Sequence, residues 1–148
     1  MRSLGNTMTY EAFLELYGTL TYRNTGTSML PMLKQGRDSF TVKKKTTQRC
    51  RKYDVILYRR PPDSYVLHRV IAVREHDYVV LGDNCINKEY VKDSDIIGIM
   101  TDFTHNGKEY RVTDKQYQKY VRFWCKTANL RIFCKKVKLR AKRMIHAK

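Results

Sequence analysis

One serine in this chain stands where a nucleophile could be displayed. The stretch NTGTSMLPML, Asn24–Leu33, places Ser28 two residues after Gly26 and three residues before Pro31. Glycine allows a tight bend and proline prevents a strand from continuing, so the Ser28 hydroxyl and backbone N–H should both be accessible. A serine hydroxyl at its ordinary pKa is a weak nucleophile. It needs a neighbouring base and a hydrogen-bond donor for the oxyanion that develops on the attacked carbonyl.

Among the four histidines, His68 is the best candidate for the base. The others, His76, His105 and His146, fall in expected turns or in the basic tail, whereas His68 lies in the strand-like segment YVLHRVIAV. A lone strand histidine is by itself more often structural. Asp83 follows the next expected strand in a Gly-Asp-Asn turn, so a hairpin of the two strands would bring it beside His68 to orient the imidazole. Taken alone, the Gly-Asp-Asn segment is also consistent with a simple turn that has no role in chemistry.

The elements that would position these residues are mainly strands. Apolar side chains on one face predict a helix over Thr9–Tyr17, which Gly18 should end. Runs rich in β-branched and aromatic residues follow it, separated by turn residues. The expected strands are Leu20–Thr25, Ser39–Lys43, Asp54–Arg60, Tyr65–Arg74, Tyr78–Leu81, Glu89–Val91 and Ile96–Asp102. This order predicts a mainly β (α+β) fold built around a compact antiparallel β domain.

From Asp114 onward the apolar spacing becomes helical. A first stripe comprises Tyr117, Tyr120, Val121, Trp124, Cys125 and Ala128, and a second comprises Leu130, Phe133, Cys134, Val137, Ala141, Met144 and Ile145. One or two amphipathic helices are therefore expected. The chain divides into an N-terminal helix (1–18), a β domain (19–113) and a basic helical tail (114–148), with the first stripe packed on the β domain.

The positive charge of the chain is concentrated in this tail. The net charge is +16, and the residues from Lys115 onward include 12 Lys/Arg and no Asp/Glu. Such a segment suits an anionic membrane surface or nucleic acid. For the second stripe, membrane contact, nucleic-acid contact and plain packing all stay open.

Other features of the sequence argue against several classes of protein. No apolar run approaches the roughly 20 residues that span a bilayer, and the N-terminus lacks the pattern of a secretory signal. The expected location is the cytoplasm, with peripheral membrane contact through the tail. The four cysteines are too far apart for a CxxC metal site, so we expect reduced thiols, with Cys85 an incidental one, and no metal.

Three segments in this order and spacing, GTSMLPML, YDVILYRRPPDSYVLHRVIAV and VVLGDNC, resemble the type I signal peptidase and repressor-autoprotease (LexA-like) superfamily of serine peptidases. The resemblance covers roughly residues 20–100. The pair His68–Arg69 is similar to the endoplasmic-reticulum and sporulation-type branch, which has histidine in place of lysine. The resemblance implies that Ser28 is the nucleophile, His68 the general base and Asp83 the residue that orients or stabilises it.

The same resemblance implies contacts to the oxyanion and substrate from Gly26, Thr27, Ser28 and Met29, with the Ser28 backbone N–H as one oxyanion donor. Two departures from the family pattern stand out. Gly26 occupies the position at which many relatives have a second donor, a serine hydroxyl, which Thr25 or Thr27 could replace. The membrane anchor that signal peptidases normally carry is not evident either.

The expected function is that of a serine endopeptidase cleaving a leader or signal segment from a peptide or precursor protein, without a cofactor. Neutral His68 as the base would make activity rise through a pKa near or above 6.5. Two alternatives are a DNA-associated repressor-type autoprotease and a non-catalytic peptide-binding module. Nucleic acid is the less favoured partner, because no helix-turn-helix precedes the β domain.

Overall fold

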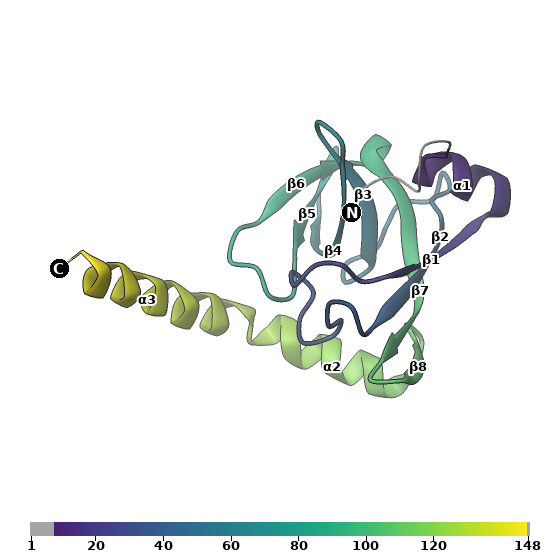
Figure 1. Cartoon of the computed structure of the whole chain (residues 1–148). Helices are drawn as coiled ribbons and strands as arrows, with labels where there is room; N and C mark the ends of the chain where they lie inside the picture. Colours follow the sequence, from purple (N-terminus) through teal and green to yellow (C-terminus); the bar gives the residue numbers. More distant parts are fainter. Residues whose placement is uncertain (1–7, 148) are drawn as a thin grey trace.

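A computed structural model describes residues 8–147 and confirms the mainly β, α+β fold (Figure 1). The strands are β1 (Thr19–Arg23), β2 (Ser39–Lys44), β3 (Val55–Arg60), β4 (Ser64–Val73), β5 (Asp77–Leu81), β6 (Glu89–Lys92), β7 (Ile96–His105) and β8 (Lys108–Arg111). The helices are α1 (Tyr10–Tyr17), the short 3-10 helix η2 (Asp93–Asp95), α2 (Lys115–Lys126) and α3 (Ala128–His146). Among the described elements, the short polar strand β8 and the 3-10 helix η2 had no predicted counterpart.

All the strands belong to one antiparallel sheet in the order β1-β2-β7-β3-β4-β5-β6, with β8 paired to β7. The expected hairpin of β4 and β5 is confirmed: Arg69 faces Leu81 across it, and Val70 faces Val80. On the other side of β4, His68 lies opposite Ile56 of β3. The loop after β5 therefore returns to the middle of β4.

Both faces of the central strand β3 are buried over its first four residues. On β3, Val55 and Leu57 contribute to one apolar cluster, while Ile56 and Tyr58 contribute to a second cluster on the opposite face. This alternation is the two-residue period of a strand with cover on both sides. The centre of the sheet is thus a rigid support for residues that β4 carries.

The two helices of the tail differ in their packing. Tyr117 and Val121 of α2 are buried in the first apolar cluster, which confirms that the first stripe packs on the β domain. In contrast, α3 has no buried residue and projects away from the sheet (Figure 1). Within residues 8–147, no helix is long and apolar enough to cross a membrane.

Candidate functional site

The bend that carries Ser28 is fixed at both ends by Asn24. Its buried side chain donates hydrogen bonds to the backbone oxygens of Gly26 (2.7 Å) and Leu33 (3.2 Å). The Met29 side chain lies in the core, so it anchors the bend and does not line the groove described below. A Cβ on Gly26 would meet no atom within 4 Å. A larger residue would therefore fit at this position, and the bend does not require glycine on steric grounds.

The loop after β5 holds the Ser28 bend from the other side. The backbone N–H of Asn84 donates to the Ser28 oxygen (2.8 Å), and its side-chain Nδ2 donates to the Thr27 oxygen (3.1 Å). Gly82 permits this approach, because a Cβ there would lie 2.8 Å from the Ser28 oxygen and 2.9 Å from His68 Nε2. The three predicted segments therefore converge at Gly82.

His68 is buried on β4, and its two ring nitrogens face different partners. Nδ1 lies 3.1 Å from the Tyr58 hydroxyl and 3.5 Å from Glu89 Oε1. The Tyr58 hydroxyl donates a hydrogen bond to Glu89 Oε2 (3.0 Å), so its oxygen can accept a hydrogen bond from an Nδ1–H group. We therefore assign the proton to Nδ1, which leaves a lone pair on Nε2 that can accept a proton.

The carboxylate next to His68 is thus Glu89, which the sequence did not single out. Arg60 donates to both of its oxygens, with the Nε contact at 3.1 Å. Burial acts to raise the pKa of Glu89, but the hydrogen bonds from Arg60 and Tyr58 outweigh it and lower that pKa. Glu89 is therefore held as a carboxylate beside the imidazole.

Burial also dominates the protonation of His68. Removal from water lowers its pKa to about 4, against the opposing influence of Glu89 and the weaker one of Asp83. This corrects the expectation of a value near or above 6.5, which gave the neighbouring carboxylate more weight than desolvation. His68 is neutral, and so able to accept a proton, throughout the physiological range.

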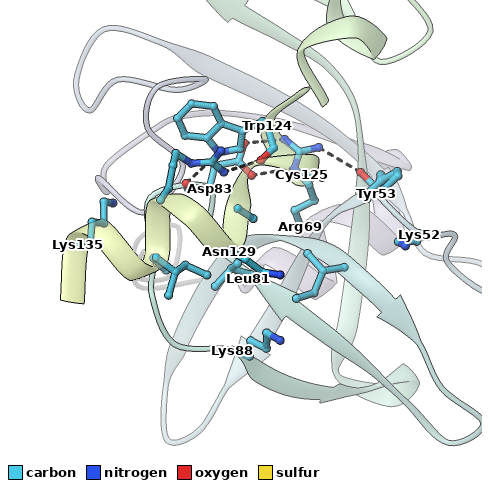
Figure 2. Close-up of a pocket in the computed structure, with 15 residues that line it drawn as sticks. Lys52, Tyr53, Arg69, Leu81, Asp83, Lys88, Trp124, Cys125, Asn129 and Lys135 are labelled. Atoms are coloured by element: carbon cyan, nitrogen blue, oxygen red, sulfur yellow. Dashed lines mark hydrogen bonds and ion pairs between the residues drawn. The ribbon is translucent and has the colours of Figure 1, made fainter. Parts of the chain in front are cut away.

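Asp83 does not make the predicted contact with His68. Its carboxylate accepts hydrogen bonds from Arg69 Nε (2.8 Å), Arg69 Nη2 (2.7 Å) and the Tyr120 hydroxyl (2.8 Å), while Trp124 Nε1 donates to its backbone oxygen (3.0 Å). Figure 2 shows the contacts of Asp83 with Arg69 and Trp124. Neighbouring residues on a strand point to opposite faces of the sheet, so His68 and Arg69 face different sides. Asp83 lies on the Arg69 side and accepts hydrogen bonds from Arg69, not from His68. Its direct role is to fix the loop.

Ser28 and His68 line the same groove, which has a volume of about 610 Å³. Thr25 and Gly26 border it near Ser28, whereas Thr27 does not line it. Val66 and Leu67 of β4 form another wall, and Lys135 and Leu139 of α3 reach it as well. Among the described residues, no hydrogen bond joins the Ser28 hydroxyl to His68. Such bonds are often long in the absence of substrate and tighten when it binds.

The Cys85 thiol lies close to the His68 ring. Cys85 Sγ lies 4.0 Å from His68 Nε2. Burial raises the pKa of the Cys85 thiol, and Glu89 raises it further, so this cysteine is not activated as a thiolate. All four cysteines are free, and residues 8–147 contain no cluster of three His, Cys, Asp or Glu placed to hold a metal ion.

Comparison with models of known protein families gives no match for this chain, and a search of curated proteins gives no significant match either. The geometry of the site is therefore the basis on which a function can be inferred.

Proposed function

We propose that this chain is a serine endopeptidase resembling the type I signal peptidases, with Ser28 as nucleophile, His68 as general base and Glu89 as the carboxylate that orients it. One observation carries the proposal. A buried, neutral imidazole has Nδ1 engaged by Tyr58 and Glu89, its Nε2 lies beside Gly82 at the Ser28 bend, and His68 and Ser28 line one groove.

In the acylation step, Ser28 Oγ attacks the scissile carbonyl and its proton passes to His68 Nε2. The imidazolium that forms is stabilised by the Glu89 carboxylate, 3.5 Å from Nδ1. His68 then donates the proton to the leaving amine. A water molecule, deprotonated by the same nitrogen, releases the acyl group from Ser28.

The oxyanion requires donors close to Ser28. The Ser28 backbone N–H makes no hydrogen bond to another described residue, so it is available for this role. Of the two threonines that could supply a second donor, Thr25 lines the groove and Thr27 does not, which favours the Thr25 hydroxyl. Removing one such donor typically slows catalysis by about 10²–10³.

The substrate that fits this site is an extended peptide segment, such as a leader or signal segment of a precursor protein. The groove is open and long enough to be bordered by the Ser28 bend, by β4 and by α3. Its walls combine apolar side chains with a larger number of polar and charged ones, which can hydrogen-bond the backbone of a peptide.

Labelling with a fluorophosphonate, followed by peptide mapping, tests the proposal without knowledge of the substrate. The probe should phosphonylate the Ser28 hydroxyl in the wild type, with loss of fluoride, and should fail to label Ser28→Ala or His68→Gln. A Cys85→Ser variant is the matched control and should still be labelled. Label on Cys85, or a folded wild type that is never labelled, would refute the assignment, and the latter result would favour the non-catalytic peptide-binding module.

A further inference from the structure

The long C-terminal helix α3 turns its apolar stripe away from the β domain. The large side chains of this stripe are highly exposed: Leu130 65%, Phe133 66%, Val137 50%, Met144 72% and Ile145 73%. They recur at the three- and four-residue spacing of one helical face. Folded proteins seldom leave a continuous apolar surface of this kind without a partner.

Polar contacts fix the opposite face of α3 against the rest of the chain. The Arg131 guanidinium lies 3.5 Å from the centre of the Trp124 ring, and it donates to the Trp124 oxygen (2.6 Å). One turn further along, Lys135 Nζ donates to the Asn84 oxygen (2.6 Å) and also contacts its side-chain oxygen. Figure 2 labels Lys135 in a second pocket, separate from the groove, which Asp83 and Trp124 also line. The helix could not roll its apolar stripe onto the β domain without breaking these contacts.

The charge on α3 decides between the partners that could cover this stripe. The helix carries seven Lys/Arg and no Asp/Glu. A second copy of the chain would bring two such helices together and would be opposed by their charge. Nucleic acid would meet the cations and leave the apolar side chains in water. An anionic bilayer surface accommodates both, because its headgroups attract the cations and its acyl boundary takes the apolar side chains.

We propose that α3 binds the surface of an anionic membrane through Leu130, Phe133, Val137, Met144 and Ile145. The groove would then lie beside that surface, because Lys135 and Leu139 of the same helix line it. Lys135 is joined through Asn84 to the oxygens of Ser28 and Thr27, so the membrane-binding helix directly contacts the loop that supports the Ser28 bend. Resting on the proposed peptidase function, this implies a precursor held at the membrane surface as the substrate.

Vesicle co-sedimentation of the full-length Ser28→Ala protein tests membrane binding independently of catalysis. The protein should pellet with phosphatidylglycerol-containing vesicles and not with pure phosphatidylcholine. Raising the salt from 0.1 to 1 M should weaken binding, because the Debye length falls from about 10 to about 3 Å, while the apolar contact retains part of it.

A pair of variants separates the two faces of α3. Phe133→Ser with Val137→Ser should reduce the partition coefficient at least roughly tenfold, since burying either side chain is worth more than about 1 kcal/mol. Leu139→Ser removes an exposed leucine from the groove side and should bind vesicles as the parent does. Circular dichroism checks that both variants remain folded.

Several outcomes would overturn the proposal. These are equal pelleting of the Phe133→Ser/Val137→Ser variant, equal binding to neutral vesicles, or no pelleting at all. Preferential binding of labelled DNA would assign the tail to nucleic acid. A dimer in sedimentation velocity that the double variant abolishes would assign the stripe to self-association. None of these results affects fluorophosphonate labelling of the wild type without vesicles, so failure of the two proposals can be told apart.

Discussion

Replacing Asp83 with Asn should strongly destabilise the fold, because it leaves a buried guanidinium without its counter-charge. The side chains of Arg69 and Asp83 are 1% and 2% exposed, and two hydrogen bonds of 2.7–2.8 Å join them. Asparagine keeps the shape of the side chain, but it removes the charge and can direct an amide donor at the Arg69 donors. Breaking a buried ion pair from one side costs about 3–5 kcal/mol. For a domain whose total stability is about 5–15 kcal/mol, that is a large fraction.

Urea denaturation, followed by circular dichroism and tryptophan fluorescence, measures this loss. Trp124 is the single tryptophan, and it donates to the Asp83 backbone oxygen, so its emission reports on the same region. Asp102→Asn is the matched control, because its carboxylate is half exposed and lies 3.8 Å from Arg111. That exposed pair should contribute less than about 1 kcal/mol.

If Asp83→Asn lowered the free energy of unfolding by less than about 1 kcal/mol, the Asp83 carboxylate would not be needed to compensate the buried Arg69 charge. A variant that kept full stability and yet lost fluorophosphonate labelling would contradict a purely structural role for Asp83, since the residue would then act in catalysis. A variant that combines Arg69→Met with Asp83→Leu should regain much of the lost stability, because no unpaired charge remains buried.

Three further predictions concern the site itself. Glu89→Gln should slow labelling of Ser28 by about 10²–10⁴ with little loss of fold, measured as the labelling rate constant, and an unchanged rate would remove Glu89 from the mechanism. The labelling rate should rise with pH through a midpoint near the His68 pKa of about 4 and be flat from about pH 5 to 8, since only neutral imidazole accepts the proton; a midpoint near 6.5 would contradict this assignment. Gly82→Ala should abolish labelling and lower the free energy of unfolding by about 1–3 kcal/mol, because its Cβ would collide with the Ser28 oxygen and His68 Nε2, whereas Gly26→Ala, which faces open space, should leave stability within about 0.5 kcal/mol of wild type.

The sequence predicted what local patterns determine. Alternating apolar residues located the strands, and the short connection between β4 and β5 made their hairpin the natural pairing, so the approach of the Gly82 loop to His68 followed. The sequence pattern did not predict the direction in which individual side chains of the loop point. Whether Asp83 serves His68 or Arg69 depends on how the loop leaves the sheet, because those two residues point to opposite faces.

Glu89 was missed for a related reason. It begins β6, and its position next to Tyr58 and His68 depends on the pairing of Val80 with Glu89 across β5 and β6. A polar residue at the start of a short strand carries no signal of such a register. The pKa of His68 likewise depends on how deeply its ring is buried. The positions of residues along the chain do not predict that burial.

The contacts of α2 have a consequence for the order in which the molecule is completed during synthesis. Hydroxyls of Tyr117 and Tyr120 bind the Arg69–Asp83 pair, and Trp124 holds the Asp83 backbone, so the loop beneath Ser28 is supported by residues that leave the ribosome after the whole β sheet. A nascent chain with all its strands made, but without α2, lacks these contacts to the loop whose Asn84 holds the Ser28 bend. Completion of the site therefore depends on residues that are synthesised after the β sheet.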